Sequence, residues 1–230
     1  MREALLAACP ILVWVFAAIH LLLLCVFFRR YSKTKNPLFL FSGLVTAGLF
    51  YDALILSLGT VLPEGALLQT LSQVRYISHG ALIPLLLPIS AYALGWKKAG
   101  RLVVWVITGI LIVVGIASGC TTVTVPERVA LVRYACDAEA TPGWSYTVST
   151  AVLAYGMVIP LVLAGIFVWI KQKTPLLFLS GFFMFAFSAL GPATGNFDLI
   201  FFISMAGEVL MVLFFLLYAE KNQKRRSVSA

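Results

Sequence analysis

The chain has 230 residues, of which 61% are hydrophobic and only 11% are charged, and its mean hydropathy is +1.00. Soluble domains carry roughly 25% charged residues, so this composition excludes an ordinary water-soluble fold. The formal net charge of +8 comes mainly from short basic segments between apolar stretches. That pattern is typical of membrane flanks and not of a nucleic-acid-binding surface. We therefore expect a membrane protein that binds no nucleic acid.

Seven apolar stretches are long enough to cross the hydrocarbon layer, which takes roughly 20 residues of helix. In chain order they cover residues 10–28, 37–59, 67–95, 102–119, 147–170, 175–193 and 198–219. The sequence thus predicts an all-α, polytopic integral membrane protein with seven transmembrane helices. The first stretch runs directly into Arg29 and Arg30 without a small-residue cleavage site, so we expect a span and not a cleaved signal peptide.

Lysine and arginine are distributed unevenly between the two sides of the predicted membrane. One side carries Arg29, Arg30, Lys33, Lys35, Lys97, Lys98, Arg101, Lys171, Lys173, Lys221, Lys224, Arg225 and Arg226. The other side carries Arg2, Arg128 and Arg133. Because basic residues concentrate in the cytoplasm, we expect an outside N-terminus and a cytoplasmic C-terminus in a cell or inner membrane. The basic flanks are expected to contact the anionic cytoplasmic leaflet of the lipid bilayer.

An internal repeat gives the predicted organisation of the chain. Residues 33–43 and 171–181 share six identities in eleven positions, and each copy is a basic turn followed by a proline and a small-residue patch. The repeat predicts two parallel three-helix halves joined by a fourth helix, a 3+1+3 plan. The single transmembrane domain then divides into a first half at 1–95, a linker helix at 96–119, an outer loop at 120–146, a second half at 147–220 and a basic tail at 221–230.

In topology and internal repeat the chain resembles the SWEET and PQ-loop transporters and, more distantly, the microbial rhodopsins. The resemblance implies a 3+1+3 fold with a substrate site between the two halves. It does not extend to motifs, because Pro37 and Pro175 are followed by leucine and not by glutamine. Every lysine lies in a predicted cytoplasmic segment, so no lysine is available in the last helix to hold retinal covalently.

Five ionisable side chains fall inside the predicted spans away from the span ends, namely His20, Asp52, Arg75, His79 and Glu208. Such groups are costly in hydrocarbon unless paired or hydrated, and they mark functional sites. Arg75 and His79 are four residues apart and so project from one helix face. By depth, Asp52 and Arg75 lie at an outer level and the other three lie near the midplane. We therefore expect one ligand- or proton-binding cluster in the outer half of the bundle, with added hydroxyls from Tyr51, Tyr76, Ser78 and Ser204.

Structural alternatives exist for most of these residues. Arg75 could extend its guanidinium into the headgroups at the helix end. Asp52 and Arg75 could form an ion pair that only sets the helix register. His20 alone could be a hydrogen-bonded core histidine. Glu208 is the residue for which a functional role is favoured, because its predicted position is near the membrane midplane.

The cysteines and the loops carry further expectations. Cys120 and Cys136 bracket the outer loop, so a disulfide between them is an open alternative on an oxidising outer side. Cys9 and Cys25 are expected to pack as apolar side chains. The spacing of cysteine and histidine predicts no metal site and no cofactor. Asp198, which follows a turn over 191–196, is expected to be a cap or rim residue.

Three function classes remain open at this point. The sequence favours a small-solute or proton-coupled transporter that takes a small-molecule or lipid ligand. A membrane-embedded enzyme acting on a lipid or isoprenoid is the alternative, with Asp52, His79 and Glu208 doing acid and base work. A retinal-free, rhodopsin-like ligand sensor is a further alternative. Whether the protein is an enzyme and whether it forms a homo-oligomer are not decided by the sequence.

Overall fold

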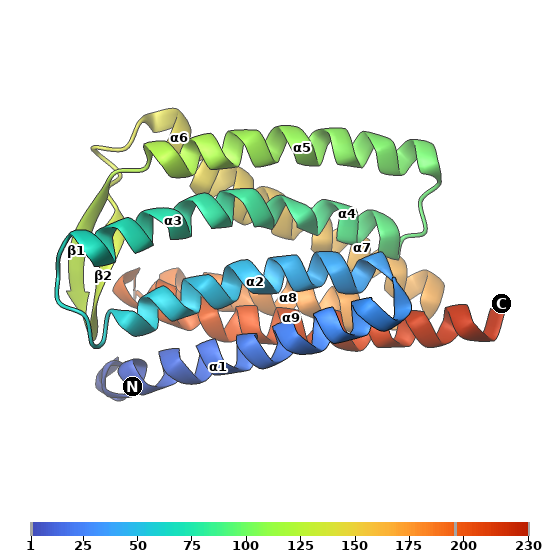
Figure 1. Cartoon of the computed structure of the whole chain (residues 1–230), viewed down its shortest axis with the longest axis horizontal. Coiled ribbons are helices and arrows are strands. Elements are labelled where there is room, and N and C mark those ends of the chain that lie inside the picture. Colours follow the sequence, from blue (N-terminus) through green and yellow to red (C-terminus); the bar gives the residue numbers. More distant parts are fainter. Residues whose placement is uncertain (1, 196, 230) are drawn as a thin grey trace.

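A computed structural model of the chain describes residues 2–195 and 197–229. Its long helices run side by side along one axis (Figure 1). Within these residues, seven helices are long and apolar enough to cross a membrane: Arg2–Thr34, Pro37–Leu58, Ala66–Ala93, Lys98–Thr121, Gly143–Gln172, Leu176–Ala193 and Ile200–Ser227. They correspond one to one with the predicted stretches. The all-helical, seven-span part of the prediction is therefore confirmed by helix length and composition.

The first two spans are the continuous helices α1 (Arg2–Thr34) and α2 (Pro37–Leu58). The turn between them ends at Asn36, whose side-chain oxygen accepts a hydrogen bond of 3.1 Å from the backbone N–H of Leu38. A proline follows at the first helical position, where no N–H donor is needed. This local chemistry explains why α2 begins where the sequence predicts.

The third span is broken into α3 (Ala66–Leu82), the 3-10 turn η1 (Ile83–Leu85) and α4 (Leu86–Ala93). Pro84 lies within η1 and Pro88 in the first turn of α4, and neither has a backbone N–H to continue the helical hydrogen bonds. The chain accordingly tightens into a 3-10 turn, as is common where the α-helical ladder is interrupted.

After α5 (Lys98–Thr121) the predicted outer loop contains a β-hairpin, which we did not expect. Strand β1 (Thr124–Val129) pairs antiparallel with β2 (Leu131–Cys136) around Ala130, whose φ is +61°. Glu127 and Arg133 are direct partners in this register and form an ion pair across the strands. The segment is rich in valine and threonine, which favour strands, so the signal was present but was read only as a loop.

The remaining elements are the short helix α6 (Gly143–Thr147), the π-helix η2 (Val148–Tyr155), α7 (Gly156–Gln172), α8 (Leu176–Ala193), the 3-10 turn η3 (Phe197–Leu199) and α9 (Ile200–Ser229). Helix α8 continues into the turn predicted over 191–196, of which residue 196 lies outside the described residues. Asp198 in η3 forms a 2.6 Å ion pair with Arg2. This hydrogen bond from the guanidinium holds the pKa of Asp198 below its usual value.

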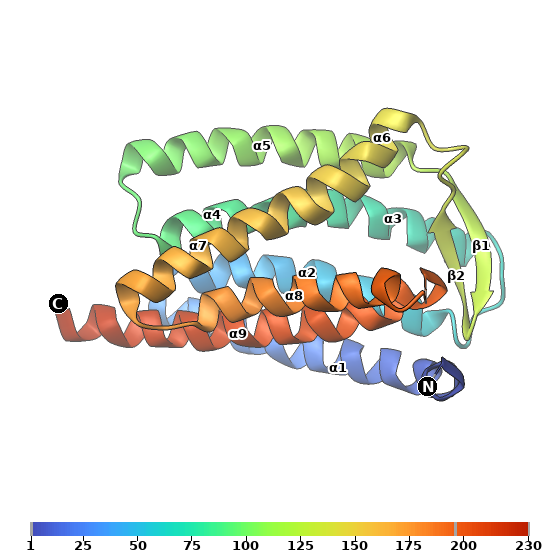
Figure 2. The ribbon, with the colours of Figure 1, turned by 180° about the vertical axis from the view of Figure 1, so that it is seen from behind.

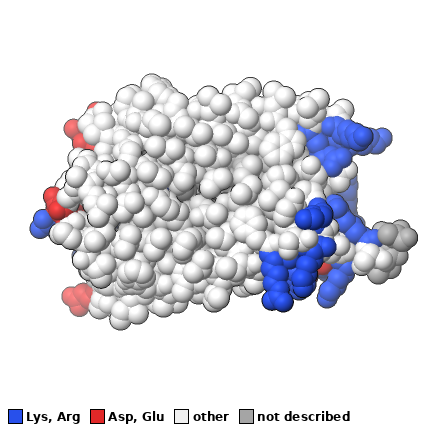
Figure 3. All heavy atoms as spheres, in the orientation of Figure 1, with Lys and Arg blue, Asp and Glu red and all other residues white. Residues whose placement is uncertain are grey.

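Helix α2 lies in the middle of the bundle, against α1, α3, α4 and α9. Helix α5 packs on α3 and α4, and α9 packs on α8 and α1. Helix α7 runs obliquely from the side of α5 toward α8 (Figure 2). The lysine and arginine side chains gather at the end of the bundle that holds the C-terminus, whereas acidic residues lie at the opposite end (Figure 3). We call these the basic end and, after β1 and β2, the hairpin end.

The two copies of the repeat share local structure. Lys35 and Lys173, at equivalent positions, both have a φ of +52°. The equivalent glycines Gly43 and Gly181 both approach the preceding helix closely, with an added Cβ falling 3.1 Å from Phe27 and 2.8 Å from Val162. The turns are therefore alike, while the pairing of two three-helix halves stays a prediction.

The apolar core divides between the two ends of the bundle. The largest cluster fills the half of the bundle nearer the basic end, which we call the basic half; the other is the hairpin half. Members of this largest cluster include Phe27, Phe39, Ile89, Phe215 and Tyr218. A smaller cluster joins α1, α2 and α9 toward the hairpin end. The basic half is thus closely filled by large side chains.

The contact between α3 and α5 depends on glycine. An added Cβ at Gly115 would lie 2.3 Å from the carbonyl oxygen of Gly80, which is too close for any side chain. We predict that Gly115→Ala lowers the free energy of unfolding by about 1–3 kcal/mol, because the two helices must separate. Gly109→Ala on the same helix is the control, since its Cβ would meet nothing within 4 Å. Thermal unfolding in lipid nanodiscs measures both, and equal stabilities would contradict the close approach.

Candidate functional site

A cavity of about 590 Å³ lies among α2, α3, α5, η2, α8 and α9. Four of the five predicted site residues line it, namely Asp52, Arg75, His79 and Glu208. They come from α2, α3 and α9, so the bundle brings together residues that the sequence placed at two levels of the membrane. The volume falls in the range of about 300–1,000 Å³ that is usual for a small-molecule site.

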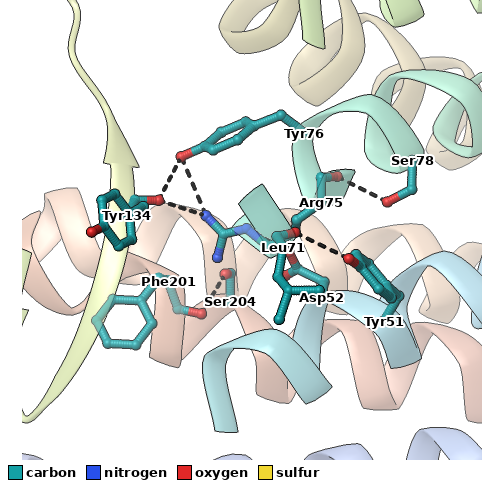
Figure 4. Close-up of polar contacts among 9 residues, drawn as sticks. All are labelled: Tyr51, Asp52, Leu71, Arg75, Tyr76, Ser78, Tyr134, Phe201 and Ser204. Atoms are coloured by element: carbon teal, nitrogen blue, oxygen red, sulfur yellow. Dashed lines mark hydrogen bonds and ion pairs between the residues drawn. The ribbon is translucent and has the colours of Figure 1, made fainter. Parts of the chain in front are cut away.

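Asp52 and Arg75 form the ion pair that connects α2 to α3 beside the cavity. The Nε atom of Arg75 lies 3.2 Å from Oδ1 of Asp52 (Figure 4). Arg75 is only 8% exposed, so the alternative in which its guanidinium reaches the headgroups is wrong. The guanidinium also lies over the ring of Tyr76, at 5.0 Å from its centroid.

The hairpin supplies a partner that sequence reasoning missed. Nη2 of Arg75 donates hydrogen bonds to the hydroxyl of Tyr76 at 3.2 Å and to the backbone carbonyl of Tyr134 at 3.4 Å. The hydroxyl of Tyr76 donates to the same carbonyl at 3.3 Å (Figure 4). The hydroxyl of Tyr134 in turn contacts the backbone of Gly65. Strand β2 is thus held across the end of α3, and a backbone carbonyl takes part in the site.

Glu208 on α9 has a different environment. The residue is only 5% exposed, and its Oε2 atom is buried without a hydrogen-bond partner. It interacts electrostatically with both Asp52 and Arg75. A buried polar atom without a partner costs free energy, and such an atom in a cavity is a candidate ligand contact.

The two histidines have separate positions. His79 lines the cavity on the same helix as Arg75. His20 is fully buried and does not line the cavity. Its Nδ1 atom lies 2.9 Å from the carbonyl oxygen of Phe16, one turn earlier, while Nε2 has no partner. The expectation that all five residues form one cluster is therefore met by four of them, and His20 has the geometry of a core histidine.

The expected hydroxyl groups are only partly at the site. Tyr76 and Ser204 line the cavity, whereas Tyr51 donates to the carbonyl of Leu71 and Ser78 donates to the carbonyl of Arg75. Further lining residues with hydroxyl groups that we did not predict are Ser118, Thr122, Tyr146, Ser149, Thr150, Tyr155 and Ser188. Four of these belong to α6 and η2, and π-helical turns are frequent at functional sites.

The disulfide between Cys120 and Cys136 is not supported, since both cysteines are free thiols. Cys120 is exposed near the end of α5. Cys136 pairs with Thr124 in the hairpin and places its sulfur 3.4 Å from the hydroxyl of Thr141. The hairpin therefore directs the two sulfurs to different surroundings. Among the described residues, no group of three histidine, cysteine, aspartate or glutamate side chains could hold a metal ion.

The ion pair is testable with a double-mutant cycle. Asp52→Asn and Arg75→Gln should each lower the free energy of unfolding by about 3–5 kcal/mol, because each leaves a buried charge without its partner. The double variant should cost less than the sum of the two. The control is the pair between Arg128, 74% exposed, and Glu64, for which Glu64→Gln should cost no more than about 1 kcal/mol. Additive effects at Asp52 and Arg75 in thermal unfolding would contradict a coupled pair.

No protein-family model matches the chain, and no curated protein matches it in sequence. The resemblance to SWEET and PQ-loop transporters and to microbial rhodopsins is thus limited to the seven-helix topology. What the site does has to be inferred from its own geometry: a buried ion pair, a histidine and a carboxyl group without a partner around one cavity.

Proposed function

We propose that the protein carries a small molecule across the membrane and that Glu208 carries a proton in the same cycle. The supporting observation is that Glu208, whose Oε2 atom is buried without a hydrogen-bond partner, lines the same cavity as the Asp52–Arg75 ion pair. Ionisable groups at membrane depth are costly and are found along substrate and proton pathways. The Asp52–Arg75 pair would fix the wall of the ligand cavity, and His79 would relay the proton between Glu208 and solvent.

In this proposal the hairpin end faces the outside and the basic end faces the cytoplasm. The gathering of lysine and arginine at the basic end supports this orientation (Figure 3). The shared φ of +52° at Lys35 and Lys173 supports two related three-helix halves in a 3+1+3 plan. Transporters built from parallel repeats have their substrate sites between the halves, near the membrane midplane.

The broken third helix is the proposed point of movement. Ile83 and Leu86 line the cavity and also belong to the core of the basic half. The 3-10 turn between them therefore separates the cavity from the closely packed region. Where prolines remove helical hydrogen bonds, a helix bends at lower cost than elsewhere. Bending at η1 would open a route from the cavity toward the basic end.

A polar contact at the basic end would have to break in the same movement. The carbonyl oxygen of Ala93, the last residue of α4, accepts hydrogen bonds from the amide of Gln172 at 2.9 Å and from the hydroxyl of Tyr218 at 3.2 Å. Gln172 also accepts a 3.2 Å hydrogen bond from Arg225 through its side-chain oxygen. These residues connect α4, α7 and α9, and in this proposal their contacts keep the basic end closed.

A membrane-embedded enzyme is the second candidate. The observation that favours it is the presence of one imidazole and two carboxyl groups, from His79, Asp52 and Glu208, around one cavity. Such groups suffice for general acid and base catalysis when they reach the substrate. An enzyme needs access to the cavity from one side only, whereas a transporter needs access from both.

An experiment that shows from which sides of the membrane the cavity can be reached therefore distinguishes the two candidate functions. Ser204→Cys, in a background without the four native cysteines, places a single thiol at the cavity wall. A membrane-impermeant maleimide is added to either side of sealed vesicles. Glu139→Cys and Lys224→Cys, both exposed and at opposite ends of the bundle, report which side is outward. We expect labelling of Ser204→Cys from both sides, and labelling from the hairpin side alone would contradict transport and favour the enzyme.

Glu208→Gln tests the proton carrier in the same assay. The reaction of a thiol with maleimide itself speeds up as pH rises and the thiolate forms, so each rate is taken relative to that of the exposed Glu139→Cys thiol at the same pH. With Glu208 present, this relative rate at Ser204→Cys should change between about pH 5 and pH 8, because a proton binds to or leaves the carboxyl group. Glutamine resembles the protonated acid and cannot titrate, so this variant should keep the low-pH relative rate throughout. Glu220→Gln, which removes the partner of Arg30 at the basic end, should keep the wild-type pH dependence. A Glu208→Gln profile that still follows pH would exclude the proton role.

A further inference from the structure

The cavity opens sideways between two helices that separate toward the hairpin end. Helices α7 and α8 are packed together, but η2, which continues α7 toward that end, packs against α5 and α6 instead. The two spans therefore diverge, as the oblique course of α7 shows in Figure 2.

The side chains at this opening are exposed although they line the cavity. Tyr155 at the end of η2 is 53% exposed, and Phe185 on α8 is 44% exposed. Ala154 and Pro192 also line the cavity and are exposed. Residues that both line a cavity and reach the molecular surface mark its mouth. Tyr146 and Thr150 also line the cavity and are exposed, so the mouth is apolar and aromatic around Phe185 and carries hydroxyl groups toward α6.

The mouth faces the hydrocarbon of the membrane and not water. Tyr155 and Phe185 both lie inside spans, Gly143–Gln172 and Leu176–Ala193. At 1.5 Å per residue, Tyr155 lies about 18 Å along its helix from Gly143, near the middle of that span. Phe185 is likewise near the middle of α8. A molecule that passes between them comes from the bilayer.

The deep end of the cavity selects for a head group that donates hydrogen bonds. The guanidinium of Arg75 is already engaged by Asp52 and by the oxygens of Tyr76 and Tyr134, so it is not free to attract an anion. Glu208 lines this end of the cavity, and its carboxyl oxygens are hydrogen-bond acceptors, of which Oε2 is buried without a partner. A hydroxyl or ammonium head can donate a hydrogen bond to the Glu208 carboxyl group, whereas a carboxylate has no proton to donate.

We propose that the cavity takes a single-chain lipid from the bilayer through the opening between η2 and α8. Its hydroxyl or amine head donates a hydrogen bond to Glu208, and its chain extends past Tyr155 and Phe185 into the hydrocarbon. The proposal rests on the proposed function for the role of the cavity and names the class of molecule that the cavity binds. The cavity volume of about 590 Å³ holds one head group and part of one chain, while the rest of the chain stays in the membrane.

The probe is octadecanol that carries a photoreactive diazirine and an alkyne on its chain, added to the full chain in phosphatidylcholine nanodiscs. After illumination, mass spectrometry should locate the cross-links in α8 and in the segment 144–160. Unlabelled octadecanol or octadecylamine should compete, and octadecanoate should not. Competition by only one of the first two identifies the head as hydroxyl or amine. Equal competition by octadecanoate would overturn the selection by Glu208, and labelling spread over all helices would overturn the site.

Two pairs of variants locate the path. Ala154→Trp fills the mouth and should reduce cross-linking about tenfold, since an added large side chain excludes the probe. Ala151→Trp is the control, because Ala151 is exposed on the same π-helix and does not line the cavity. Glu208→Gln keeps an acceptor oxygen and should retain labelling, whereas Glu208→Leu removes it and should abolish the preference over octadecanoate. Equal labelling of Ala154→Trp and Ala151→Trp would refute the lateral path.

Together with the thiol assay at Ser204→Cys, these variants show whether the lipid site or the transport function is wrong. If the maleimide reacts from both sides but cross-linking ignores Ala154→Trp, the lateral path is wrong and transport stands. If the maleimide reacts from one side only while Ala154→Trp still blocks the probe, transport is wrong and the lipid site stands.

Discussion

The buried ion pair between Arg75 and Asp52 is the interaction on which the hairpin half of this protein depends. A guanidinium in the interior is tolerated only when its charge and its donors are satisfied. Asp52 on α2 neutralises the charge at 3.2 Å, and the carbonyl of Tyr134 on β2 accepts a hydrogen bond at 3.4 Å. One side chain on α3 therefore fixes the position of a neighbouring helix and of the strand that lies across the bundle end. The cavity is bordered by the same groups.

The basic half of the bundle is closely packed, whereas the hairpin half contains the candidate binding site. The basic half is filled by large apolar side chains such as Phe39 and Phe215, which is how a helix bundle gains its packing energy. The hairpin half has a cavity, a π-helix and an unpartnered oxygen on Glu208, each of which forgoes stabilisation. Structures retain such features where a site requires them. The 3-10 turn at Ile83–Leu85 lies where the two regions meet.

Much of the fold was predictable because membrane helices obey few rules. Backbone groups in hydrocarbon must be bonded within the helix, so span number and approximate limits follow from apolar length alone. The break near Pro84 was not among our predictions, but its physical reason is the missing N–H donor. The hairpin over 124–136 was not predicted, because a strand needs a partner and its short valine-rich signal resembles a loop between spans. Nothing in the sequence placed the sulfurs of Cys120 and Cys136 apart, since that depends on the hairpin register.

By itself the sequence determined that the chain has seven apolar helices, a basic end and a few ionisable groups at membrane depth. These are properties of each segment taken separately. Only the tertiary structure decided that Arg75 and Glu208 share a cavity while His20 does not, because side-chain neighbours depend on how each helix is rotated and tilted. The divergence of α7 from α8, which opens the cavity toward the bilayer, is likewise a relation between two helices. The sequence pattern of neither helix predicts this divergence.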